Sequence, residues 1–251
     1  MGKWFIRIIG VLLIVIIASG LILYFTDNRY SLSIKSYYAM KKATSMDLSF
    51  ESKMGMGENS IGITGETQLT TSPKVSMTEV SMILPVLGNL NIMDVYTSED
   101  KIFHKYNMSF LPWQEGMPIL QEDAFNPAMF GELDMNVELL DILKFASVLD
   151  KGSEGELLEY YTTDFFTEEE FKAMLVSVLK LDETQVKDWN IKAYKISFAF
   201  NKEKKELERI SIAFDHDISE VVLSNQFMLT LNELNSISDI PVPEGLPLSQ
   251  P

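Results

Sequence analysis

The residues best suited to chemistry are few in this chain. It has two histidines, His104 and His216, and no cysteine, which excludes disulfides, thiolate nucleophiles and cysteine-based metal sites. Asp215-His216-Asp217 has the composition of a metal-ligand triplet, but adjacent residues of a strand point to opposite faces. A solvated hairpin turn is the preferred interpretation of the triplet. His104, a single histidine in a predicted strand, makes no stronger case for a metal.

Acidic side chains are numerous, but no spacing selects a pair of them. The chain carries 36 Asp and Glu against 21 Lys and Arg, a formal charge of −15, which argues against a nucleic acid as partner. The run Glu168-Glu169-Glu170 lies at a predicted helix N-terminus, where negative charge is favoured without a catalytic role. No G-x-G-x-x-G, P-loop, H-E-x-x-H or G-x-S-x-G motif occurs. We expect no enzyme, no cofactor and no metal site; a hydrolase using two carboxylates is a weaker alternative.

A long apolar segment near the N-terminus predicts a membrane helix. Residues 4–25 read WFIRIIGVLLIVIIASGLILYF, with Arg7 as the only charge. At about 1.5 Å per residue, the segment is long enough to cross a hydrocarbon core of about 30 Å. A cleaved signal peptide is the alternative, because Lys3 and Arg7 form a positive leading region and small residues follow at the spacing of a cleavage site. We favour a retained single-pass anchor in the cell membrane, with the following domain on the extracytoplasmic side.

The rest of the chain shows two periodicities. Alternation of apolar and polar residues predicts strands around residues 46–50, 61–63 and 75–77, and over 90–97, 101–106, 191–200, 207–215 and 218–231. Helical spacing predicts a short helix within 31–43, one over 134–149, one opened by the capping box of Thr167 and Glu170, and a short one from Asp182. Prolines break residues 110–130 into a long excursion.

This order of elements predicts the α+β class. Short polar turns between consecutive strands indicate antiparallel meanders, which need one face covered by helices. We expect an N-terminal transmembrane helix followed by a curved antiparallel sheet, a half-barrel, with helices packed on its concave face. The expected divisions are an anchor over 1–26, a stalk and short helix over 27–44, the half-barrel domain over 45–245, and a tail over 246–251.

Several stretches carry a resemblance to a known family. They are Tyr38-Ala39-Met40-Lys41-Lys42-Ala43, Asp47-Leu48-Ser49-Phe50-Glu51 and the closing Leu231-Asn232-Glu233-Leu234-Asn235 with Ile240-Pro241-Val242-Pro243. Together with the leading export segment, this arrangement resembles the LolA/LppX-like envelope proteins, and most of all their uncharacterised lipoproteins from Gram-positive bacteria. The resemblance implies a half-barrel with an apolar cavity that carries or senses lipids and acylated ligands. Leu21 stands where those lipoproteins have the lipidated cysteine, which favours a tethered binder over a diffusing carrier.

Methionines and one aromatic loop supply the candidate binding residues. Fourteen methionines suit a pocket for variable acyl chains, and they equally suit an ordinary core. The loop with Phe110 and Trp113 is either a lid or docking patch, or a loop folded back on the core. The candidate ligand-binding residues are Met77, Met82, Phe110, Trp113, Leu139, Leu143, Met174 and Phe198.

The sequence thus leaves two functions to compare. The first is a membrane-anchored, extracytoplasmic, non-catalytic binding protein for a lipid or another apolar ligand. The alternative is an envelope sensor or protein-interaction module whose core is filled by its own side chains. An open apolar cavity beneath the central helices would favour the first function, and a solid core with an exposed apolar patch would favour the second.

Overall fold

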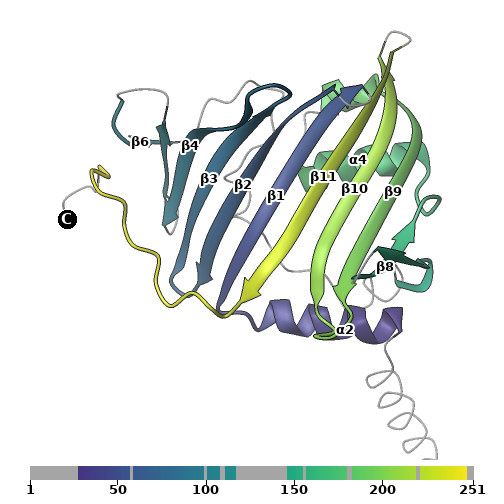
Figure 1. The fold of residues 1–251 in the computed structure, drawn as a ribbon, viewed down its shortest axis with the longest axis horizontal. Coiled ribbons are helices and arrows are strands. Elements are labelled where there is room, and N and C mark those ends of the chain that lie inside the picture. Colours follow the sequence, from purple (N-terminus) through teal and green to yellow (C-terminus); the bar gives the residue numbers. More distant parts are fainter. Residues whose placement is uncertain are drawn as a thin grey trace, which may run out of the picture.

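A single large β-sheet dominates the fold. The computed structural model describes residues 28–56, 59–98, 101–107, 111–116, 146–154, 157–179, 183–218 and 221–247. Within these residues, eleven strands form one sheet in the spatial order β6-β5-β4-β3-β2-β1-β11-β10-β9-β8-β7 (Figure 1). All neighbouring strands are antiparallel.

The strands come in two runs along the chain. The first run consists of β1 (Ser45–Met56), β2 (Asn59–Thr71), β3 (Lys74–Leu84), β4 (Gly88–Ser98), β5 (Lys101–Tyr106) and β6 (Gln114–Glu115). The second run consists of β7 (Asp150–Glu154), β8 (Leu157–Thr162), β9 (Asn190–Asn201), β10 (Leu207–Ile218) and β11 (Val221–Leu234). The two runs meet in the middle of the sheet, where β11 pairs with β1 and Leu229 lies opposite Phe50.

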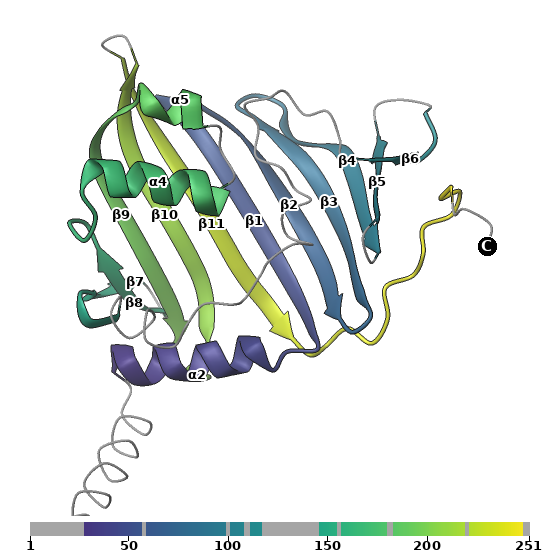
Figure 2. The same cartoon turned by 180° about the vertical axis from the view of Figure 1, so that it is seen from behind.

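Three described helices accompany the sheet: α2 (Arg29–Lys41), α4 (Glu168–Leu179) and α5 (Glu183–Lys187). Figure 2 shows α4 lying across β9, β10 and β11, with α5 near the end of these strands and α2 along the opposite end of the sheet. We call the face under α4 the inner face and the other one the outer face. Alternation along each strand sends apolar side chains to the inner face. The buried core there consists of Phe50, Val80, Met93, Val95, Phe171, Leu175, Ile196, Ile212, Phe214 and Phe227.

A smaller apolar cluster lies on the outer face, beneath the chain that follows β11. We call this segment, residues 235–247, the C-terminal tail. After β11, Asn235 takes a positive φ of 59° and its side-chain oxygen accepts hydrogen bonds from the backbone N–H and the hydroxyl of Thr44, at 2.7 and 3.0 Å. Asparagine tolerates this conformation better than most residues. The tail then brings Ile240 against Tyr96, Phe103 and Trp113. The tail therefore closes the outer face over β3, β4 and β5.

The predicted fold class and location need correction. The described chain is mostly one antiparallel sheet of eleven strands, with short helices beside it rather than an α+β half-barrel led by a membrane helix. The predicted membrane helix, residues 4–25, lies outside the described residues. Among the helices that the structure describes, none combines the length and the apolar character needed to span a membrane. The predicted single-pass placement in the cell membrane, with an extracytoplasmic domain, is therefore withdrawn.

The individual elements match the sequence patterns to different degrees. Residues 101–106 form β5 as predicted, and the segments 90–97, 191–200 and 207–215 lie within β4, β9 and β10. The capping box at Thr167 opens α4, and α5 follows close to its expected start. The predicted turn at Asp215-His216-Asp217 is wrong, because β10 continues through it. Strands β7 and β8 were not predicted, and most of the helix expected over 134–149 lies outside the described residues.

Candidate binding surfaces

The space between α4 and the sheet is filled by aromatic side chains. Phe171 and Leu175 of α4 are fully buried. The ring of Phe171 stacks on Tyr194 of β9, with centroids 4.3 Å apart and planes at 15°, and meets Phe214 of β10 edge-on at 5.7 Å. The Tyr194 hydroxyl accepts the N–H of Phe166 at 2.5 Å and donates to its carbonyl at 3.0 Å. Beneath α4 the structure therefore has a packed core.

The same burial acts on the ionisation of Tyr194. Removal from water disfavours the phenolate and raises the pKa of Tyr194, while the hydrogen bond from the Phe166 backbone opposes the shift and the charges of Asp164 and Glu170 add to it. Tyr194 is therefore a neutral hydroxyl that ties the chain before α4 to β9. It serves as a structural group in the core.

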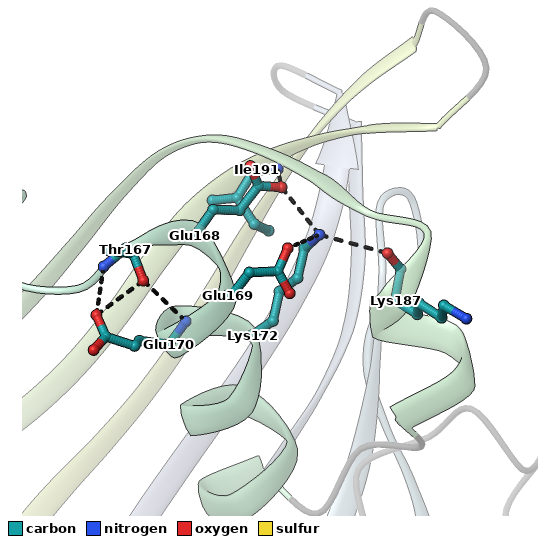
Figure 3. Close-up of polar contacts among 7 residues, drawn as sticks. All are labelled: Thr167, Glu168, Glu169, Glu170, Lys172, Lys187 and Ile191. Atoms are coloured by element: carbon teal, nitrogen blue, oxygen red, sulfur yellow. Dashed lines mark hydrogen bonds and ion pairs between the residues drawn. The ribbon is translucent and has the colours of Figure 1, made fainter.

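The N-terminus of α4 is a network of polar contacts, drawn in Figure 3. Thr167 donates its backbone N–H and its hydroxyl to Glu170 Oε2, both at 2.9 Å, and the Thr167 hydroxyl accepts the N–H of Glu170 at 3.4 Å. This reciprocal pair is a capping box. The backbone N–H and then the hydroxyl of Thr167 lower the pKa of Glu170. The acidic run thus caps the helix, as its position in the sequence predicts.

Lys172 connects this helix end to its neighbours. Its ammonium lies 3.0 Å from Glu168 and 3.8 Å from Glu169, and donates to the Lys187 carbonyl of α5 at 3.5 Å. Glu168 in turn accepts the backbone N–H of Ile191 in β9 at 3.2 Å. The hydrogen bond from Lys172 comes first among the causes that lower the pKa of Glu168, followed by the one from Ile191. These contacts fix α4 to α5 and β9.

His216 is the most unusual polar group on the inner face. Its side chain is 0% exposed and its ring stacks on Trp189, with centroids 4.4 Å apart. Asn225 Nδ2 lies 2.7 Å from His216 Nδ1, so the amide donates and Nδ1 accepts. The ring proton then sits on Nε2, which has no hydrogen-bond partner among the described residues. Burial lowers the pKa of His216, against the opposing charges of Asp217 and Asp215.

An exposed apolar surface lies on the inner face at the far ends of the first four strands. We call it the apolar rim; it consists of Met54, Ile61, Met82 and Leu90. Met54 pairs with Ile61, and Met82 pairs with Leu90. Their exposed fractions are 42, 54, 38 and 40%. Ile63 lies opposite Met82 and packs against the buried core, so the rim is continuous with the core.

The outer face carries a shallow groove of a different character. Its volume is about 510 Å³, and residues of β1, β2, β9, β10 and β11 line it, most of them small or polar, together with Tyr194 and Phe214. Two lysines of this lining are already paired, Lys53 with Glu51 at 2.7 Å and Lys195 with Glu159 at 2.6 Å. Acidic neighbours therefore neutralise both lysines of the groove.

The predicted ligand-binding residues do not form one site. Met77 and Trp113 meet in the outer cluster under the tail. Met174 and Phe198 pack against the inner core, and Met82 belongs to the apolar rim. Phe110, Leu139 and Leu143 lie outside the described residues. Sequence reasoning missed Met54, Ile61 and Leu90 as members of an exposed surface, although the alternation of β1, β2 and β4 places each of them on a predictable face.

No metal centre is found in the described part of the chain, where no three His, Asp or Glu side chains converge. His104 Nδ1 lies 2.9 Å from the Gly116 carbonyl, an ordinary structural contact. Asp215 and Asp217 point away from His216 because they alternate with it along β10. The triplet therefore does not converge on one point.

Comparisons with known proteins give distant likenesses. No family model and no curated protein matches the chain. The chain is similar to the crystal structure of the lipoprotein LppX from Mycobacterium tuberculosis, with 13% identity and a TM-score of 0.46, over 85% of this chain and 98% of that chain. It is also similar to a DUF1329 family protein from Desulfovibrio piger, with 9% identity and a TM-score of 0.31, over 85% of this chain and 93% of that one. The resemblance to Gram-positive lipoproteins stays a prediction.

Proposed function

We propose that the protein binds a lipid or another apolar ligand on the inner face of the sheet, at the apolar rim, and does not convert it chemically. The observation that carries this proposal is the exposure of four aliphatic side chains from four adjacent strands, beside a buried core. Apolar surface in water is unfavourable by about 25 cal/mol per Å². An acyl chain lying along the rim would remove that surface from water.

The side-chain types at the rim suit such a ligand. Met54 and Met82 are unbranched and polarizable, so they can adapt to chains of different shape. Ile63 leads from the rim to the core and extends the apolar path inward. Contiguous exposed apolar patches of this kind typically mark binding surfaces. The residues that could do acid–base chemistry lie elsewhere, with His216 buried against Trp189.

The packed core beneath α4 favours a second candidate, a protein-interaction module. Phe171, Tyr194 and Phe214 fill the space that a ligand cavity beneath α4 would need. On this alternative the rim docks a protein, and no small molecule is bound. The two candidates share the rim and differ in its occupant.

The test is native mass spectrometry with organic extraction of the full chain, followed by titration with a fluorescent fatty acid. We expect a copurifying lipid and saturable uptake of the fatty acid. The double variant Met82→Gln with Leu90→Asn should bind the fatty acid about tenfold more weakly, because two aliphatic contacts are lost.

The matched control is Val242→Asn, which changes a side chain 53% exposed in the tail on the outer face. It should bind the fatty acid like the native chain. A native mass equal to that of the protein alone, with no binding of the fatty acid, would refute ligand binding and favour the interaction module. Native affinity in the rim variant would place the ligand somewhere else.

A further inference from the structure

The hairpin between β3 and β4 ends in a strongly exposed apolar tip. Val86 is 93% exposed and Leu87 is 78% exposed. Gly88 follows with a positive φ of 75°, which glycine adopts without strain and which closes the turn. We call Val86 and Leu87 the hairpin tip. Two adjacent aliphatic side chains held almost wholly in water need an explanation beyond folding, because they contribute little to the core.

Charge is absent from the half of this hairpin nearest the tip. Residues 80–93 read VSMILPVLGNLNIM, without a charged side chain, in a chain of which 23% is charged. The nearest acids, Glu79 and Asp94, pair across β3 and β4 and alternate with Val80 and Met93. Since Val80 and Met93 belong to the inner core, both acids lie on the outer face. The tip and its inner side are therefore uncharged.

The apolar β3–β4 turn differs from the turns at the opposite end of the sheet. The β1–β2 and β3–β4 hairpins lie at the same end, as Figure 1 shows, and Met54 and Ile61 pair near the first of these turns. The turns at the opposite end are polar. They contain Thr71-Ser72-Pro73-Lys74 between β2 and β3, and Lys202-Glu203-Lys204-Lys205 between β9 and β10. At the end that carries the hairpin tip, the β3–β4 turn is the apolar part, whereas β10 carries Asp215 and Asp217 near its own turn.

The side-chain types distinguish a lipid layer from a protein as the occupant. Protein interfaces are anchored by Trp, Tyr and Arg in closely fitting pockets. The tip and the rim contain only Val, Leu, Ile and Met, and the tip projects from the sheet. Insertion of aliphatic side chains among acyl chains requires no complementary shape. The net charge of −15 makes an anionic surface unfavourable.

We propose that the hairpin tip, Val86 with Leu87, inserts into the surface of a zwitterionic lipid layer and docks this end of the sheet on it. This inference goes beyond ligand binding and does not depend on it, because the tip stands outside the rim. Docking would place the rim next to the lipid. A ligand taken up at the rim would then have a short path from the layer.

The absence of cysteine from the chain allows a local test. In the full chain, Val86→Cys is labelled with an environment-sensitive fluorophore and mixed with phosphatidylcholine vesicles. The label should shift to the blue and be quenched by a lipid-borne quencher. Adding Leu87→Asp should raise the lipid concentration for the half-maximal shift about tenfold. Vesicles rich in phosphatidylglycerol should give a weaker response.

Val242→Cys, labelled in the same way, is the control, because this exposed site lies on the outer face and its spectrum should not change. If vesicles do not change the emission of the label at position 86, the proposal is overturned. Equal emission shifts for labels at positions 86 and 242 would also overturn it. So would a shift at position 86 that grows with protein concentration in the absence of lipid, because the tip would then contact a second copy of the chain. Titration with a fatty acid in solution, without vesicles, measures ligand binding at the rim and does not depend on docking. Failure of docking and failure of ligand binding are therefore distinguishable.

Discussion

At the scale of single residues, His216 shows what a local pattern does not reveal. Its neighbours Asp215 and Asp217 suggest a solvated turn, yet the turn of this hairpin comes after Ile218. A boundary error of two residues changes the environment of the imidazole completely, because side chains in a strand alternate between faces. The result is a buried, neutral ring between Trp189 and Asn225.

We predict that His216 makes stability depend on pH. Because the folded pKa lies below the ordinary value near 6.5, the unfolded chain binds the proton first as pH falls. The free energy of unfolding should therefore decrease as pH falls below about 6.5, by at most about 1.4 kcal/mol per pH unit for one proton. Urea unfolding of the native chain between pH 7 and 5.5 measures this slope.

Two variants isolate the contribution of His216. His216→Phe keeps a ring against Trp189, and His216→Gln keeps a polar group near Asn225, but neither titrates in this range. Both should show a smaller slope than the native chain. An unchanged slope in both variants would mean that the pH dependence comes from other groups.

At the scale of elements, the sequence best predicts those features that depend on residues close together in the chain. The capping box of Thr167 and Glu170 lies within four consecutive residues, and the structure has it with all its hydrogen bonds. The apolar spacing of Phe171 and Leu175 likewise places both on the buried face of α4. The sequence does not predict β7 and β8, because DKGSE and its partner strand lack a clear alternation of apolar and polar residues. β7 pairs with β8, and only β8 pairs with β9, which follows α4 and α5 in the chain.

We predict that Thr167→Ala destabilises the chain by about 1 kcal/mol, because the backbone N–H of Glu170 loses its acceptor and the Glu170 carboxylate loses the hydroxyl donor. Thr167→Ser keeps the hydroxyl and should stay close to native stability. Chemical denaturation of both variants decides the point. Equal loss in the two variants would show that the methyl group of Thr167, and not its hydroxyl, is what α4 requires.

At the scale of the whole molecule, the tail joins two distant parts of the sheet. It begins at Asn235, beside the start of β1, and ends against the strands that carry Tyr96 and Phe103. The sequence indicates that Ile240 is apolar, but it does not indicate which face the tail covers. For the same reason the sequence suggests a ligand beside Met77 and Trp113, whereas in the structure the tail packs against them. The predicted domain boundaries stay predictions.

The tail should contribute measurably to stability. Ile240 is 5% exposed, so Ile240→Ala removes buried methyl groups and should cost about 2 kcal/mol. Val242→Ala, two residues on and exposed to solvent, should change the free energy of unfolding by less than about 0.5 kcal/mol. Urea denaturation compares the two variants. Similar small effects would show that the outer cluster is stable without its cover.

The pairing of β11 with β1 has a consequence for the order of folding. Met46 lies opposite Leu234, so the central seam of the sheet joins residues separated by most of the chain. During synthesis from the N-terminus, β1 to β6 and β7 to β10 emerge as two separate meanders. The edges of β1 and β10 stay unpaired until β11 is made, in addition to the outer edges of β6 and β7. Only the last strand to leave the ribosome can bridge them. A chain interrupted before β11 would therefore expose the edges of β1 and β10 as well, and unpaired strand edges are templates for aggregation.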